Sequence, residues 1–290
     1  MNSKILIVIG TIIIIIAISG VYYAQLNNEE IIKRKAVQDV SDSDIQKKIE
    51  PNIPASLFRM IVSEDDYIIN NGIKIWSNAE FELKPEFADL YDDIGITNNP
   101  QNTIVILPTF TAMAYSENGF YSYYKQECDT NCLTVEIDSY QLGYHGSDNA
   151  VKVLKLLGYS FVTDVDVDKN PNILSKYDKI ILLHNEYVTR NEFDAITNHH
   201  KVIYLYPNAL YAEIKTNYDK NTITLVRGHN YPIPEIKNGF DWKFDNTVFE
   251  YDIECKDMYF YNIANGFMLN CYPEHMIYKN KVLLKAIKEF

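Results

Sequence analysis

The sequence is poor in basic residues and lacks the short motifs that mark several common activities. Its 27 Lys and Arg residues are outnumbered by 39 Asp and Glu residues, so the formal net charge is −12 over 290 residues. The basic residues form no stripe along the chain, and the composition therefore argues against nucleic acid as a partner. No Gly-x-Ser-x-Gly or Gly-x-Cys-x-Gly elbow is present, which argues against a serine hydrolase and a cysteine-dependent amidotransferase.

Cysteine is scarce, and its even number is informative. The four residues are Cys128, Cys132, Cys255 and Cys271. An even count suits disulfide bonds in an oxidising compartment, and of the three possible pairings we favour Cys128–Cys132 with Cys255–Cys271. Zinc is an alternative, although neither pair has the tight Cys-x2-Cys spacing of structural zinc sites, and buried free thiols are another. The disulfide interpretation places the globular part of the chain outside the cytoplasm.

Charge is absent from residues 5–24, "ILIVIGTIIIIIAISGVYYA", a run of about twenty residues that is long enough to cross the hydrocarbon core of a bilayer. Lys4 precedes the run, and Tyr22 and Tyr23 occupy the place of an interfacial aromatic belt. A cleaved signal peptide is the rival interpretation, but its apolar region would be shorter, and a tyrosine would stand where cleavage requires a small residue. We predict a single-pass transmembrane anchor over residues 1–25, with the lipid bilayer as its partner.

Residues 26–56 are polar, mix both charges and end in a segment with two prolines, so we expect a stalk between the anchor and a globular domain. Lys33, Arg34 and Lys35 favour a cytoplasmic position for the side on which they lie, but long domains are translocated largely irrespective of such charges. Because the cysteines indicate an oxidising compartment, we expect a cell-membrane protein whose globular domain is extracytoplasmic.

The remaining residues, 57–290, predict one α/β domain with three parts. Residues 57–102 form a β-rich lead-in, residues 103–228 alternate apolar strands with helices, and residues 229–290 combine a β-hairpin region with a closing helix. Strands that alternate with helices pair in parallel through right-handed crossovers, so the predicted fold is a doubly wound, mostly parallel sheet with added β strands at both ends. The expected elements are strands at 103–108, 133–137, 159–167, 179–184, 201–207, 247–255, 258–264 and 267–273, and helices at 147–158, 192–199 and 281–290.

Ligands of an open parallel sheet bind at the carboxyl ends of its strands. Strand 179–184 ends there with His184 and is followed by Glu186, which makes both of them candidate site residues. Alternatively, the two side chains cap the next helix, where a carboxylate is electrostatically favoured, or satisfy backbone groups of the loop. Two further strands end in loops that carry polar side chains, namely Thr109, Thr111, Tyr115 and Ser116 after strand 103–108 and Asn208 after strand 201–207.

Three other patterns are weaker. The "GYHGS" string at 143–147 is expected to be a turn that leads into a helix, because no lysine follows it as in a phosphate-binding loop. The "DVDVDKN" string at 164–170 lacks the glycine and the distal glutamate of an EF-hand, and we expect it at the edge of a strand. His199 and His200 follow a helix and are expected in a solvated turn.

Three segments, in the same order, resemble the N,N-dimethylformamidase large-subunit family. Residues 106–124, "ILPTFTAMAYSENGFYSYY", resemble its LPT-x-T-x-x-AYN-x-x-G-x-x-SLY segment, and residues 177–196 resemble its YD-(apolar)-H-x-EYW segment. Residues 202–214, "VIYLYPNALYAEI", resemble the strand and loop that come next in that family. The resemblance covers residues 103–214 and implies a fold like that of the class I glutamine amidotransferases.

For function, the resemblance implies a mononuclear iron site that hydrolyses small amides. Glu186 and Tyr115 occupy ligand positions of the motifs, and Tyr140, after strand 133–137, is the best-placed second tyrosine ligand. His184 and Asn208 would act as catalytic or substrate-orienting groups beside the metal. Phenolate and carboxylate oxygens suit ferric iron, which polarises a carbonyl and activates water.

The chain departs from the family pattern at Val188, where the family has tryptophan, and at Ser116, where it has asparagine, and it is far shorter than the family's subunit. These features are compatible with two functional hypotheses. The first is a non-catalytic surface domain that binds a small molecule or a protein partner in the crevice. The alternative is an iron-dependent hydrolase of small amide or C–N bonds.

Overall fold

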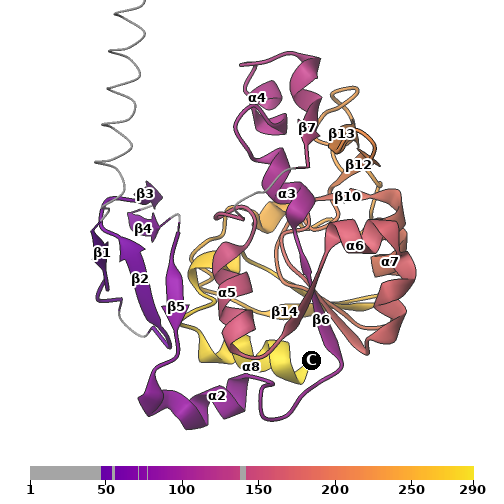
Figure 1. Ribbon diagram of the computed structural model, residues 1–290. Coiled ribbons are helices and arrows are strands. Elements are labelled where there is room, and N and C mark those ends of the chain that lie inside the picture. Colours follow the sequence, from indigo (N-terminus) through magenta and orange to yellow (C-terminus); the bar gives the residue numbers. More distant parts are fainter. Residues whose placement is uncertain (1–46, 54–55, 71, 77, 138–141) are drawn as a thin grey trace, which may run out of the picture. The chain divides into compact units, whose positions relative to one another are not determined.

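The computed structural model describes residues 47–290 apart from 54–55, 71, 77 and 138–141 (Figure 1). The predicted anchor, 1–25, and most of the predicted stalk, 26–56, lie outside the described residues. Within the described ranges, no helix is long and apolar enough to cross a membrane. The anchor therefore stays a prediction.

The described chain is a mixed α/β protein built around a six-stranded sheet with the order β14-β15-β11-β9-β6-β8. All neighbouring strands in it are parallel except the β14–β15 pair. The chain passes from β6 to β8 at one edge and then returns to β9 on the other side of β6, so the direction of winding changes between β6 and β9. The strands are β6 (Thr103–Leu107), β8 (Ser160–Thr163), β9 (Lys179–Leu182), β11 (Val202–Tyr204), β14 (Phe260–Ile263) and β15 (Gly266–Leu269).

Both faces of this sheet are buried, which explains why its strands are continuous apolar runs rather than alternating ones. Val105 belongs to a core with residues of α5 and α8, whereas Ile104 and Ile106, which point the other way, belong to a core with residues of α6 and α7. Figure 1 shows α5 and α8 on one side of β6 and α6 and α7 on the other. These helices are α5 (Asp148–Leu156), α6 (Asp164–Lys169), α7 (Arg190–Thr197) and α8 (Lys281–Glu289).

A second sheet of four strands has the order β10-β12-β13-β7, with β10 and β12 parallel and the other pairs antiparallel. The predicted strand 133–137 lies in this sheet and not in the central one, because β7 pairs with β13. Two short helices precede β7 along the chain. The bounds are α3 (Thr109–Ala114), α4 (Phe120–Tyr124), β7 (Thr134–Glu136), β10 (Tyr187–Thr189), β12 (Ala212–Asn217) and β13 (Thr222–Arg227).

The lead-in is rich in short strands, as predicted. β2 and β5 pair antiparallel, and so do β3 and β4. Phe58 and Met60 at the start of this region pack into the same core as α5. The elements here are β1 (Lys48–Ile49), β2 (Arg59–Ser63), β3 (Tyr67–Asn70), β4 (Ile73–Trp76), β5 (Glu80–Glu82) and α2 (Ala88–Ile94). Short 3-10 turns lie at Pro85–Phe87, Thr130–Leu133, Pro171–Lys176, Thr247–Phe249 and Pro273–His275.

The predicted strand 159–167 is right only in its first half, where β8 lies, and the predicted strand 247–255 is wrong. Residues 164–169 form α6, because Thr163 and Asp166 form a capping box in which each side chain accepts a hydrogen bond from the other's backbone N–H. Residues 247–255 form a turn and a loop, since the Asp245 carboxylate accepts a hydrogen bond from the N–H of Thr247 at 2.9 Å and bends the chain. The predicted hairpin is confirmed, with Ala264 and Asn265 between the ends of β14 and β15.

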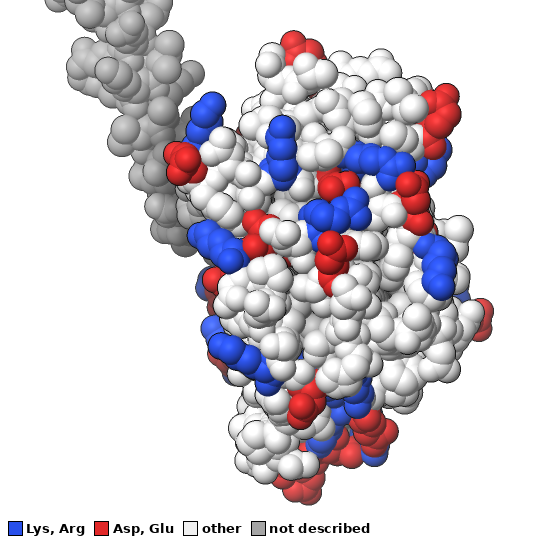
Figure 2. Space-filling view, turned by 90° about the vertical axis from the view of Figure 1, so that its right-hand side faces the viewer, with Lys and Arg blue, Asp and Glu red and all other residues white. Residues whose placement is uncertain are grey.

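The predicted disulfide pairing is confirmed. Cys128 bonds to Cys132, and Cys255 bonds to Cys271, with Cα–Cα distances of 6.1 and 5.3 Å. The first bond closes the loop between α4 and β7, and the second ties the loop before β14 to the end of β15. On the face shown in Figure 2, acidic and basic side chains are interspersed, and neither sign forms a continuous patch.

Candidate functional site

Two neighbouring strands deliver polar side chains to one edge of the central sheet. β6 leads into α3, which is followed by Tyr115, and β9 leads to His184, Asn185 and Glu186. The two strands pair with each other, and the change in winding direction lies between them. A switch point of this kind leaves a crevice at the carboxyl ends of the strands, which is where such sheets bind ligands.

Local hydrogen bonds end β9 and orient the residues after it. The Asn185 side-chain oxygen accepts a hydrogen bond from the N–H of Leu183 at 3.1 Å, so the chain turns instead of extending the strand. The Thr111 hydroxyl, which comes from α3, accepts hydrogen bonds from the N–H of Glu186 at 3.0 Å and of Tyr187 at 3.2 Å. One buried hydroxyl therefore fixes the backbone that carries the site carboxylate.

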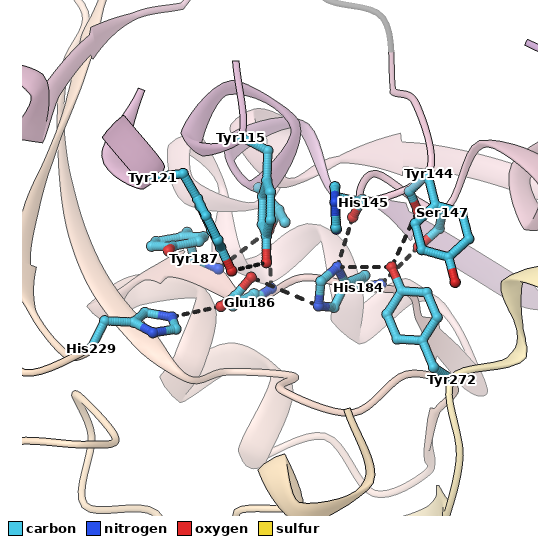
Figure 3. A network of polar contacts seen from close by, with 11 residues as sticks. Tyr115, Tyr121, Tyr144, His145, Ser147, His184, Glu186, Tyr187, His229 and Tyr272 are labelled. Atoms are coloured by element: carbon cyan, nitrogen blue, oxygen red, sulfur yellow. Dashed lines mark hydrogen bonds and ion pairs between the residues drawn. The ribbon is translucent and has the colours of Figure 1, made fainter. Parts of the chain in front are cut away.

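Glu186 is fully buried and lies between two imidazoles (Figure 3). Its Oε1 is 2.5 Å from Nε2 of His229, and its Oε2 is 3.7 Å from Nε2 of His184. Burial is the largest influence on the pKa of Glu186, and it raises that pKa. The charge and hydrogen bond of His229 act in the opposite direction, as do His184 and the Tyr115 hydroxyl. Together these three residues outweigh burial, so the pKa lies below its ordinary value. The carboxylate is ionised at neutral pH.

His184 has one nitrogen engaged and one without a partner. Its Nδ1 lies 2.7 Å from the carbonyl oxygen of His145, and because a carbonyl only accepts, Nδ1 carries the proton. Its Nε2 is buried and has no hydrogen-bond partner within the described residues. Burial lowers the pKa of His184 below its ordinary value despite the nearby Glu186. The ring is therefore neutral at neutral pH, with its Nε2 lone pair facing the carboxylate.

Tyr115 forms the other wall of this cluster. Its hydroxyl is 2.6 Å from the hydroxyl of Tyr121 and points toward Glu186, while its ring stacks on His145 with centroids 4.1 Å apart (Figure 3). Burial, followed by the Glu186 charge, raises the pKa of Tyr115 well above its ordinary value. The phenol keeps its proton unless a cation displaces it.

Asn208 and Glu250 complete the polar set. Asn208 follows β11 in the left-handed region (φ +60°) and is buried, and neither polar atom of its amide makes a hydrogen bond of normal geometry within the described chain. Burial and the Glu186 charge raise the pKa of Glu250, although the Asn208 amide favours its ionised form. Glu250 and His184 both line a cavity of about 120 Å³, which is closed on other sides by Tyr144 and Tyr272.

The structure brings together four of the five residues that the sequence assigned to catalysis or metal binding: Tyr115, His184, Glu186 and Asn208. Tyr140, the fifth, lies outside the described residues. The first half of the alternative for His184 and Glu186 is wrong, because α7 is capped by Thr189 in a capping box with Glu192. The second half holds for His184, whose Nδ1 donates to the backbone oxygen of His145 in a loop. Ser116 is exposed and donates to the backbone oxygen of Met113.

The sequence did not point to His229 or Glu250. His229 lies in the string "GHNYP", whose composition indicates only a turn, and Glu250 lies in a region predicted as a strand. Each reaches the cluster through the tertiary path of a loop after β13. Glu250 is followed by Asp252 and Glu254, so its charge gave no specific signal.

The donor atoms fit a hard transition metal in part. Within the described residues, no three His, Cys, Asp or Glu side chains are arranged to hold a metal ion. Glu186 Oε2 and His184 Nε2 are nevertheless buried without hydrogen-bond partners, and the Tyr115 hydroxyl lies beside them. One carboxylate, one phenol and one imidazole form a donor set of the type that suits iron.

Comparison of the chain with protein-family models and with curated proteins finds no match.

Proposed function

We propose that the chain is a hydrolase of small amide or related C–N bonds, with its site at the switch point between β6 and β9. One observation carries this proposal: His184 Nε2 and Glu186 Oε2 are both buried, lie 3.7 Å apart, and make no hydrogen bond of normal geometry with the described residues. A buried polar atom without a partner costs about 1–3 kcal/mol. A pair of them beside a small cavity is expected where a polar substrate or ion supplies the missing contacts.

The residues divide into a base and an acid by their environments. His184 is neutral with a free Nε2, so it takes a proton from water as the water oxygen bonds to the amide carbon. Glu250 has a raised pKa, so it is the group that gives a proton to the departing nitrogen. The C–N bond breaks, and the products are a carboxylic acid and an amine. Asn208, whose amide lies beside the Glu250 carboxylate, is placed to orient the substrate.

The family resemblance adds iron to this site, held by Tyr115 and Glu186, with Tyr140 as the further tyrosine. Such an ion, when bound, polarises the amide carbonyl and lowers the pKa of a water molecule. The cavity of about 120 Å³ limits the acyl or amine group beside His184 to a few heavy atoms.

Metal analysis of the purified protein tests the proposal. We expect stoichiometric iron, an absorption band from tyrosinate-to-iron charge transfer, and hydrolysis of formamide-type substrates. Glu186→Gln and Tyr115→Phe should each abolish hydrolysis and weaken or remove the band, whereas the exposed controls Glu235→Gln and Tyr259→Phe should leave both unchanged. Absence of iron together with no hydrolysis would overturn the proposal.

The second candidate is a non-catalytic domain that binds a small polar molecule in the same crevice. The ion pair between His229 and Glu186 favours it, because the carboxylate that would hold iron already has a partner at 2.5 Å. The two departures from the family motif, Val188 and Ser116, point the same way. Saturable binding of a small amide without turnover, in a protein free of iron, would support this candidate over the first.

We further propose that the domain lies outside the cell membrane, held there by residues 1–25. The two disulfide bonds support an oxidising compartment. Protease added to intact cells should degrade the domain, and protection from that protease would contradict the assignment.

A further inference from the structure

A second cavity of about 820 Å³ is lined in part by His229, and its lining is mostly aromatic and acidic. Its walls include Tyr121, Tyr123 and Tyr124 from α4, His229 from the loop after β13, and the side chains of Glu127 and Asp129. This second cavity shares only His229 and Tyr121 with the site described above. It is far larger than the cavity beside His184.

The aromatic rings of this cavity stand roughly perpendicular to one another. Tyr124 packs edge-to-face with Tyr121, at 5.7 Å and 82°, and with Tyr123, at 5.8 Å and 71°. Tyr124 also lies 5.2 Å from His229, and Tyr123 packs edge-to-face on Tyr231. Three tyrosines contribute rings to the wall of this cavity, and the negative face of an aromatic ring attracts cations. We call Tyr121, Tyr123, Tyr124 and His229 the tyrosine cage.

The charged residues that line the cage are acidic, although Lys237 donates from outside the lining to the side chain of Asn230, which lines the cavity. Glu127 and Asp129 are exposed at its edge, and none of the described residues that line it is a lysine or an arginine. A cation that enters the cage therefore meets ring faces and carboxylates without a competing basic side chain from the lining.

Local bonds hold the cage in place before any ligand arrives. The disulfide Cys128–Cys132 closes the segment next to α4, and the Asp129 carboxylate accepts the N–H of Asn131 at 2.8 Å. The N–H of Glu127 bonds to the carbonyl oxygen of Ser122 at 2.9 Å, which ties this segment back to the helix. Rings and carboxylates that are already in position cost less to order on binding.

We propose that the tyrosine cage binds an alkylammonium group, quaternary or tertiary, of a small molecule. The site is separate from the proposed hydrolase and requires neither iron nor Glu186. A neutral polar ligand such as a sugar would also stack on tyrosine rings, but the carboxylates of Glu127 and Asp129 in the lining favour a cation.

The test compares choline with its neutral isostere 3,3-dimethyl-1-butanol, on the full-length protein in a detergent without an ammonium headgroup. Titration calorimetry or saturation-transfer NMR should show saturable choline binding, with the isostere at least about tenfold weaker. Equal affinity for the two, or no saturable choline binding at roughly 100 mM, would overturn the proposal.

Variants locate the site. Tyr124→Phe keeps the ring and should change choline affinity by no more than about threefold, whereas Tyr124→Leu should weaken it by about 5- to 30-fold. Glu127→Gln with Asp129→Asn should weaken choline but not the isostere, and these exposed positions do not endanger folding. Tyr259→Leu, on another surface, is the control.

The outcome is independent of the hydrolase proposal. Glu186→Gln should bind choline as the unaltered protein does, even if it holds no iron. Choline binding that disappears with Glu186→Gln but survives Tyr124→Leu would place the cation in the Glu186 cluster and contradict the cage.

Discussion

His229 donates a hydrogen bond from Nε2 to Oε1 of Glu186 at 2.5 Å, and the two residues are 43 positions apart in the sequence. The backbone of His229 lies in the left-handed region, at φ +51°, which is costly for a residue with a Cβ. Gly228 precedes it at φ +125°, where an added Cβ would lie 2.9 Å from the Cα of Ala212. The loop is thus strained and closely packed, and its path delivers one imidazole to a buried carboxylate.

His229→Ala should destabilise the protein by about 3–5 kcal/mol at pH 7, because it leaves the Glu186 carboxylate buried without its partner. The folded-state pKa of Glu186 is depressed, so its contribution to stability is present above the ordinary glutamate pKa and is lost as pH falls through the folded value. The deficit of the variant should therefore shrink toward acidic pH. Urea unfolding at several pH values measures it, with exposed His200→Ala as control, and a deficit that is constant with pH would contradict the ion pair.

Thr111→Val should destabilise the protein by about 2–5 kcal/mol, since two buried backbone N–H groups, of Glu186 and Tyr187, lose their acceptor. Thr111→Ser keeps the hydroxyl and should cost about 1 kcal/mol or less. Denaturant unfolding compares the two. If serine costs more than valine, the methyl group and not the hydroxyl is what this position requires.

Much of the central sheet could be predicted because its strands are short apolar runs with polar ends. The run that ends at His184 identified β9, and the i, i+3, i+4, i+7 pattern identified α5. The Asp/Val alternation of 164–169 led to a wrong prediction, because the same sequence is compatible with an alternating strand and with the capped first turn of a helix. The capping box of Thr163 with Asp166 decides for the helix, and the burial of Val167 under the sheet completes it.

The site could be predicted only where it lies directly after a strand of the central sheet. His184, Glu186, Tyr115 and Asn208 were found by the rule that parallel strands carry ligands at their carboxyl ends. His229 belongs to the loop after β13, in the second sheet, and no periodicity links it to Glu186. Its position depends on how the two sheets pack, which a local pattern does not contain.

Glu274→Gln should change how stability depends on pH. Glu274 is fully buried, and burial raises its pKa to about 8, although the Tyr206 hydroxyl and the N–H of Asn149 donate to it. Between the ordinary value of 4.5 and about 8, only the unfolded chain has lost this proton, so the folded state loses stability as pH rises through that window.

At about 1.4 kcal/mol per pH unit, this effect amounts to a few kcal/mol by pH 8. Unfolding free energies should be measured at pH 5, 6, 7 and 8. The stability of Glu274→Gln relative to the unaltered protein should increase as pH rises. The unfolding free energy of the exposed control Glu235→Gln should depend on pH in the same way as that of the unaltered protein. Parallel curves for Glu274→Gln would mean that Glu274 is ionised in the folded state.

The two disulfide bonds should differ in what they contribute. Cys255–Cys271 spans 16 positions and Cys128–Cys132 spans 4. Closing the longer loop restricts the unfolded chain more, so removing it should cost about 3 kcal/mol against about 2 kcal/mol for the shorter one. Cys255 and Cys271 are also buried in the core with α8, whereas Cys128 is partly exposed, so the serine pair at 255 and 271 leaves polar groups in an apolar site.

Double serine variants of each pair, unfolded in urea, give the two values. Titration of free thiols in the unreduced, denatured protein should find none, and four reactive thiols would remove both bonds and the argument for an oxidising compartment. Loss of the Cys128–Cys132 bond alone should loosen the segment beside α4 and weaken choline binding, while lowering the unfolding midpoint less than loss of Cys255–Cys271 does. If removal of the Cys128–Cys132 bond instead lowers the free energy of unfolding more, the expected order is contradicted, and the segment near α4 contributes more to stability than the core beneath β15.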